Sequence, residues 1–250
     1  HHEPMLPDGA APFSRVLTVA MAGSTNSDLA AARRADPTQW PHLSVLRAEH
    51  QDAGRGRLDR DWVTPPGQAL TFSTVLVSSR PREEWASLTA LGGLAVVRAV
   101  RILGADAALK WPNDVVLRGA PAALPGWGSS RKLAGVLAEV VRDASGQEAV
   151  ILGIGVNVAQ RELPVPWATS LALAGVEVTP QELLAAIGQE LVAALAVRHP
   201  RPRRARRDRR RWASRGNSRD ARRRRSPPGS ARRWLAHDHR LRRCTSPASG

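Results

Sequence analysis

The first 197 residues alternate between segments with strand-like and helix-like spacing of apolar residues. Apolar and β-branched runs predict strands, and apolar residues three to four positions apart predict helices. The predicted strands cover 15–19, 43–48, 69–77, 133–141 and 150–158, with two short pieces within 109–117. The predicted helices cover 29–34, 85–103 and about 180–197. This order predicts a mixed α/β or α+β domain with a central sheet of roughly five to seven strands.

Local signals mark where these elements begin and meet. Ser24–Ser27 and Thr179–Glu182 supply capping residues before the first and last helices. Gly92-Gly93 predicts close packing of the second helix, and 143–147 is the predicted turn of a hairpin. Residues 119–130 are rich in Gly, Ala, Pro and Ser, which predicts a surface loop.

The composition changes near residue 198. Residues 1–200 carry 18 Lys and Arg against 19 Asp and Glu, whereas 201–250 carry 19 against 3. The whole formal charge of +15 therefore comes from the last fifth of the chain, and the body is not a basic domain. No apolar stripe continues beyond this point, so we expect a structured domain at 1–197 and a disordered arginine-rich tail at 198–250.

Other classes are excluded quickly. Cys244 is the only cysteine, which excludes a disulfide framework and a cysteine metal cluster. The start, His1-His2-Glu3-Pro4, does not resemble a secretion signal, and no apolar run is long enough to span a bilayer. We therefore expect a cytoplasmic protein without a membrane partner.

Lysine is rare. Only two of the 37 basic residues are lysines, Lys110 and Lys132, which indicates that these positions require a compact ammonium group. Codon bias is the alternative explanation. Lys110 lies in a five-residue segment with Asn113 and Asp114, in which Lys110 is suited to balance phosphate charge and Asp114 to hold Mg²⁺ beside a nucleotide. A turn with surface charges explains this segment equally well.

Glycines accompany polar residues in three further segments. Gly54 and Gly56 in the loop at 49–57 let backbone N–H groups approach a ligand, and the arginines between and after them are forked donors for phosphate or carboxylate. A solvated turn is the alternative for this loop. Lys132 precedes Gly135 at a strand start, and Gly153 precedes Asn157, and a glycine within a strand often marks a close ligand.

Ser24-Thr25-Asn26, Gly54–Arg57, Lys110–Asp114, Lys132–Gly135 and Gly153–Asn157 together resemble the catalytic domain of biotin protein ligase, in this order and at these spacings. The resemblance spans about 14–197. It implies an α+β fold with a mixed central β-sheet flanked by helices, similar to the catalytic domain of class II aminoacyl-tRNA synthetases. It implies formation of biotinyl-5′-AMP from biotin and ATP with Mg²⁺, and transfer to a lysine of a biotin carboxyl carrier protein.

The resemblance also implies site residues. Lys132 sits at the reacting carboxylate and α-phosphate, Arg55 shields the adenylate in a loop that closes on ligand binding, and Lys110 is the third catalytic cation. The implied biotin contacts are Ser24, Thr25, Asn26, Gln51, Gly54, Arg55, Gly56, Arg57, Lys132 and Gly135. The implied ATP or adenylate contacts are Arg57, Trp62, Lys110, Asn113 and Asn157, with Asp114 as the Mg²⁺ ligand. Such cations offset the repulsion between two anions, about 1 kcal/mol at roughly 4 Å in water and more in a dry site.

Two features depart from the family pattern. Only 23 residues precede Ser24, too few for the winged helix of the repressor members, so we expect a monofunctional ligase that binds no specific nucleic acid. The tail at 198–250 stands where the family has a small β-barrel. We hypothesise that this tail is an out-of-frame reading, because it is built from residues encoded by G/C-rich triplets and lacks Ile, Val and Lys. A genuine tail would impair catalysis.

Two other functions remain open from the sequence. Lipoate ligase has the same overall fold and adenylation chemistry, but lipoate lacks the ureido ring, and the two motifs at 54–57 and 110–114 favour biotin. A nucleic-acid-binding protein that uses the tail would bind without sequence preference and with steep salt dependence. The sequence does not indicate the oligomeric state.

Overall fold

The structure is a computed structural model and describes residues 12–56, 61–62 and 64–197. The strands are β1 (Arg15–Ala22), β2 (Ser44–Gln51), β3 (Ala69–Leu76), β4 (Ala107–Lys110), β5 (Asp114–Leu117), β6 (Arg131–Arg142) and β7 (Glu148–Asn157). The helices are α1 (Thr25–Ala35), α2 (Ala86–Ile102) and α3 (Pro180–Ala196), with short 3₁₀ turns η2 (Arg82–Glu84) and η3 (Ala172–Ala174). The predicted N-terminal start, Arg57 and the arginine-rich tail lie outside the described residues.

The seven strands form one mixed sheet in the order β1-β2-β3-β7-β6-β5-β4. β1 and β2 pair in parallel, and every other neighbouring pair is antiparallel. β6 and β7 form the predicted hairpin across 143–147, and they are the longest strands. Since β1 and β2 are parallel, α1 serves as the crossover between them. The predicted α+β class with a mixed central sheet is confirmed.

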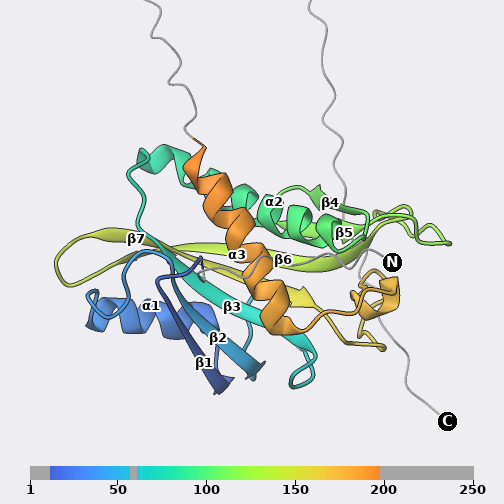
Figure 1. Cartoon of the computed structure of the whole chain (residues 1–250), viewed down its shortest axis with the longest axis horizontal. Coiled ribbons are helices and arrows are strands. Elements are labelled where there is room, and N and C mark those ends of the chain that lie inside the picture. The colour runs from blue at the N-terminus through green and yellow to red at the C-terminus, as the bar shows by residue number, and fades with distance from the viewer. Residues whose placement is uncertain (1–11, 57–60, 63, 198–250) are drawn as a thin grey trace, which may run out of the picture. The chain divides into compact units, whose positions relative to one another are not determined.

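The helices cover opposite faces of the sheet (Figure 1). α2 and α3 pack on each other and on one face, and α1 covers the other. The larger core lies under α2 and α3 and includes Phe72, Leu152 and Ile187, all fully buried or nearly so. A smaller cluster lies under α1 and includes Leu29, Val75 and Ile151.

Alternation along the central strands decides which residues face α1. In β3, β6 and β7 the even-numbered core residues, such as Phe72, Val136 and Leu152, belong to the α2 and α3 side. The odd-numbered residues Val75, Val141 and Ile151 belong to the α1 side, as expected for a period of two. Beyond the end of the apolar α1 cluster, this same α1 face carries Ser73, Gly135, Glu139, Gly153 and Gly155. A polar, glycine-lined area therefore continues the sheet surface next to the N-terminus of α1.

The close packing of α2 and the capping of α3 follow the sequence signals, whereas the α1 N-cap Ser24 makes no capping hydrogen bond with its side chain. A Cβ at Gly92 would lie 3.0 Å from Leu152 Cδ2, and one at Gly93 would lie 2.5 Å from Leu109 Cδ1, so α2 approaches the sheet at these glycines. Thr179 Oγ1 accepts a hydrogen bond from the Glu182 backbone N–H, and the Glu182 carboxylate accepts from the Thr179 backbone N–H. This reciprocal capping box starts α3 as predicted.

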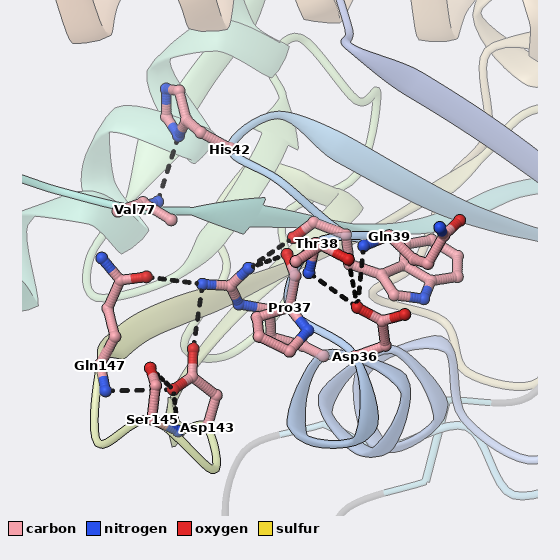
Figure 2. A network of polar contacts seen from close by, with 11 residues as sticks. Asp36, Pro37, Thr38, Gln39, His42, Val77, Asp143, Ser145 and Gln147 are labelled. Carbon is pink, nitrogen blue, oxygen red and sulfur yellow. Dashed lines mark hydrogen bonds and ion pairs between the residues drawn. The ribbon is translucent and has the colours of Figure 1, made fainter.

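A buried ion pair connects α1 to the β6–β7 hairpin (Figure 2). Arg33 Nη2 lies 3.2 Å from Asp143 Oδ2 and 3.0 Å from Gln147 Oε1, and both charged side chains are almost fully buried. Arg33 also donates to the carbonyl oxygens of Pro37 and Trp40. Hydrogen bonds from Ser145 and from the backbone of the turn hold the pKa of Asp143 below its usual value. The network fixes the orientation of α1 on the sheet.

No helix in the described part of the chain is long and apolar enough to cross a membrane.

Candidate active site

The N-terminus of α1 places three predicted site residues against the sheet. Ser24 is the N-cap of α1, and Ser24, Thr25 and Asn26 are all buried. The Thr25 backbone N–H donates to Gln51 Oε1 at 2.8 Å, which joins the start of α1 to the end of β2. Gln51 was predicted in a loop, but the parallel pairing of β1 with β2 extends the strand to this residue. These predicted biotin residues are therefore close together.

Two rows of cross-strand neighbours form the floor of the site. Thr71, Gly155, Gly135 and Asp114 are successive register partners on β3, β7, β6 and β5. Ser73 and Gly153 are partners in the next row. A side chain at Gly153 would collide with the amide of Asn26, so glycine at this position allows α1 to approach the sheet.

Trp62 lies across the first row. A Cβ at Gly155 would be 2.7 Å from Trp62 Cε2, whereas one at Gly135 would make an ordinary contact of 3.5 Å with Cζ3. The Trp62 backbone N–H donates to the Gly54 carbonyl at 2.8 Å, and Arg55 forms an antiparallel bridge with Asp61. Trp62 Nε1 is buried and has no hydrogen-bond partner among the described residues. Backbone contacts therefore connect the loop at 49–57, called the glycine–arginine loop below, to Asp61 and Trp62. The Trp62 indole in turn packs on the sheet.

Two predicted cations lie at the site, and each is paired with a carboxylate. Lys132 Nζ lies 2.8 Å from Asp114 Oδ1 and 5.7 Å from the centre of the Trp62 ring. Arg55 Nη1 lies 3.3 Å from Glu139 Oε1 and 3.4 Å from Ser27 Oγ. Each of these two cations therefore already has a carboxylate partner.

Lys110 is the register partner of Asp114 on β4, and its ammonium contacts a pair of stacked indoles. Its Nζ lies 4.2 Å from the centre of the Trp127 ring, and that ring stacks on Trp167 with 6.5 Å between centroids. This cation–π contact places the Lys110 ammonium on the predicted loop at 119–130. Asn113 Nδ2 donates to the Val136 carbonyl at 3.1 Å, so this amide fastens the turn to β6.

The Asn157 amide bonds within the protein at both ends. Its Nδ2 donates to the Thr169 carbonyl at 2.9 Å, and its Oδ1 accepts from Gln160 Nε2 at 3.2 Å. The side chain is buried, and these bonds hold the segment that follows β7. The predicted adenine contact of Asn157 remains a prediction.

The predicted Mg²⁺ ligand is a single carboxylate. Asp114 is partly buried and already faces Lys132. Within the described ranges, no group of three or more His, Cys, Asp or Glu side chains is arranged to hold a metal ion. Mg²⁺ often binds through one or two carboxylates together with substrate phosphates. Asp114 is therefore suited to hold this ion only when a nucleotide supplies the other ligands.

Sequence reasoning missed Ser73 and Glu139. Ser73 Oγ lies 2.6 Å from Asn26 Oδ1 and 2.9 Å from Thr25 Oγ1, and Glu139 Oε2 accepts from Asn26 Nδ2 at 2.7 Å. Glu139 is the one charged residue in the predicted strand at 133–141, and Ser73 lies with Thr71 and Thr74 in the predicted strand at 69–77. A polar residue at an α1-facing position of a buried strand was the available signal.

Residues 22–157 match the model of the biotin/lipoate A/B protein ligase family. This range covers more than half of the chain and includes every predicted site residue. The chain belongs to this family. The resemblance to biotin protein ligase that the motifs indicated is confirmed by the relatives within it.

Similar proteins include ligases for biotin. The chain is 43% identical over 164 residues to the biotin–[acetyl-CoA-carboxylase] ligase of Mycobacterium tuberculosis, a match that covers 63% of this chain and 55% of that protein. It is 33% identical over 156 residues to the bifunctional ligase/repressor BirA of Escherichia coli, which covers 60% of this chain and 45% of that one. The chain thus spans about half the length of these curated relatives.

A solved family structure shares the fold. Biotin protein ligase from Aquifex aeolicus in complex with biotin and ATP superposes with a TM-score of 0.58 and 29% identity, over 73% of this chain and 71% of that one. The biotin protein ligase of Leishmania major in complex with biotinyl-5-AMP has a TM-score of 0.57 and 24% identity, over 73% and 75% of the two chains. The family fold therefore accounts for the described domain.

Proposed function

We propose that this chain activates biotin with ATP and transfers it to a protein lysine. In the first step a biotin carboxylate oxygen attacks the α-phosphorus, the bond from that phosphorus to the bridging oxygen breaks, and pyrophosphate leaves with biotinyl-5′-AMP formed. In the second step an acceptor amine attacks the biotinyl carbonyl, AMP leaves, and the nitrogen loses a proton. The observation that carries the proposal is the position of Lys132 between Trp62, Gly135 and Asp114.

Lys132 is the residue suited to the first step. That step brings a carboxylate against a phosphate, so a fixed cation lowers its barrier more than proton transfer would. The Lys132 ammonium is held by Asp114 at 2.8 Å and is about a quarter exposed, so an anion can reach it from solvent. Because Asp114 orients the ammonium before the substrates bind, little reorganisation is needed.

The start of α1 and the end of β2 are suited to the biotin ring system. The Gln51 Oε1 is used by the Thr25 backbone, so its NH₂ group remains as a donor for a carbonyl. The Thr25 hydroxyl both donates and accepts. A cyclic urea has one carbonyl and two N–H groups, which supports this area as its binding site.

Trp62 and the glycine row are suited to the adenylate. An indole packed beside Gly155 and Gly135 offers an aromatic surface on which a nucleobase can stack, and its buried Nε1 hydrogen needs an acceptor. Mg²⁺ bound with the nucleotide would neutralise phosphate charge beside Asp114.

The name of the Mycobacterium tuberculosis relative states an acetyl-CoA-carboxylase acceptor, which supports a carboxyl carrier domain as the partner of this chain. The test is to incubate the full chain with biotin, ATP and such a carrier domain, and to measure biotin attached to the carrier. We expect ATP-dependent labelling of one carrier lysine, and no competition from excess lipoate. Absence of both biotinyl-AMP and labelled carrier, with the chain folded, would refute the proposal.

A further inference from the structure

Glu139 joins the two halves of the candidate biotin site through one carboxylate. It lies on β6, the strand that begins with Lys132 and contains Gly135. Its Oε2 accepts from Asn26 Nδ2 of α1 at 2.7 Å, and its Oε1 lies 3.3 Å from Arg55 Nη1 of the glycine–arginine loop. Neither the resemblance nor the family comparison assigns this residue a role.

The Asn26 contact determines which way the Asn26 amide points. An ionised carboxylate accepts hydrogen bonds and donates none, so it requires the NH₂ end of Asn26. The Leu137 carbonyl, 3.5 Å from the same nitrogen, favours the same orientation. Asn26 Oδ1 must then face Ser73, whose hydroxyl lies 2.6 Å away.

This orientation passes on to Thr25. The Ser73 hydroxyl is the donor to Asn26 Oδ1, which can only accept, and it is also the donor in the 2.9 Å contact with Thr25 Oγ1. Asn26 and Thr25 therefore share one hydroxyl as their partner on β3. The carboxylate on β6 thus helps to hold in place a hydroxyl two contacts away.

The Arg55 contact is weaker. The Arg55 side chain is 51% exposed and that of Glu139 is 34% exposed, so solvent screens the pair. The Asn26 bond is short, charge-assisted and partly buried, and it carries most of the effect.

We propose that Glu139 is a positioning residue for biotin: it fixes the orientation of the Asn26 amide and, through Ser73, holds the Thr25 hydroxyl in place for the ligand. This inference rests on the proposed function and deepens it. It assigns the placement of the Asn26 and Thr25 side chains to a residue that need not touch the substrate.

The test is biotin affinity by calorimetry with the full chain, without ATP, together with the KM values for biotin and ATP. Glu139→Leu removes the acceptor, and we expect it to weaken biotin binding roughly 10- to 100-fold while the KM for ATP stays within about twofold. Glu139→Gln keeps an oxygen for Asn26 and should stay within about threefold of the wild type. The matched control is Glu148→Gln, a carboxylate on β7 that also pairs with two arginines, Arg82 and Arg142, and should leave biotin affinity unchanged.

Wild-type affinity in Glu139→Leu, or an equal loss in Glu139→Gln, would overturn the inference. If Glu139→Leu does not fold, Asn26→Asp provides the second test, because it opposes two carboxylates. The double variant Asn26→Asp/Glu139→Gln restores a donor and acceptor pair and should regain at least tenfold in affinity; no recovery would overturn the inference. Loss of biotin binding in the wild type would refute the proposed function as well, whereas an active wild type matched by Glu139→Leu refutes only the role of Glu139.

Discussion

Lys132 Nζ lies 2.8 Å from Asp114 Oδ1 across the neighbouring strands β5 and β6. Both side chains are partly buried, at 26% and 19% exposure, and Asp114 is the register partner of Gly135. The sheet therefore fixes the separation of these two groups. The attraction between the two groups offsets part of the cost of desolvating each charge.

Lys132→Ala should reduce biotinyl-AMP formation by about 10²- to 10³-fold, since one preorganised charge at a reacting anion has this magnitude. Pyrophosphate release measures the step. Arg118→Ala is the control, because Arg118 pairs with Asp106 at an exposed position on the end of the same sheet. Equal rates in the wild type and Lys132→Ala would exclude Lys132 from the chemistry.

Gly155→Ala should displace Trp62, because the new Cβ would lie 2.7 Å from the indole. We expect a loss of about 1 to 3 kcal/mol in the free energy of unfolding, the usual cost of overpacking. Urea denaturation followed by tryptophan fluorescence measures this change. Gly135→Ala is the matched variant on the neighbouring strand β6. Its Cβ would make an ordinary 3.5 Å contact, so its loss of unfolding free energy should be clearly smaller. Equal costs at the two positions would show that the indole adapts freely.

Arg33→Met should lower Tm by roughly 5 to 10 °C, because it leaves the buried Asp143 carboxylate without its cation. Differential scanning calorimetry measures the shift. The double variant Arg33→Met/Asp143→Asn should lose less than the sum of the two single variants, since the second change removes the unpaired charge. Additive losses would mean that the two side chains do not interact.

His42 should make the fold sensitive to mild acid. Its Nδ1 accepts a hydrogen bond from the Val77 backbone N–H at 3.1 Å, and burial lowers the pKa of His42 below its ordinary value of 6.5 (Figure 2). A lowered pKa means that the folded state favours the neutral ring, so this contribution is complete above pH 6.5 and is lost as the pH falls through the folded value.

The measurement is Tm from pH 8 to pH 5 for the wild type and His42→Gln. Glutamine has an amide oxygen that accepts without titrating, so its Tm should fall less over this range. Parallel Tm curves for the two proteins would assign the acid sensitivity to other groups.

The order of strands and helices could be predicted from the sequence because each element has its own periodicity of apolar residues and is bounded by turn or capping residues. The hairpin of β6 and β7 is an example, with two apolar runs on either side of a polar turn. The buried position of Arg33 could not be predicted, because its partner Asp143 lies 110 residues away and an arginine in an alanine-rich helix is normally solvated.

The candidate site was predictable as a set of motifs and not as a set of contacts. The motifs place Thr25, Gln51 and Lys132 in one family pattern, and the structure brings the first two together through a hydrogen bond. The contact of Lys110 with Trp127 could not be foreseen, since it depends on the path of a loop whose composition specifies little.

The alternation of faces along β3, β6 and β7 restricts how this protein can change in length. Ser73, Gly135, Glu139, Gly153 and Gly155 all lie at odd-numbered positions facing α1, and the large core lies at the even positions between them. Deleting or inserting one residue within any of these strands would turn its small or polar residues toward the apolar core under α2 and α3 and present core leucines and valines to the α1 face. Length variation in descendants or engineered versions should therefore be confined to the connecting turns.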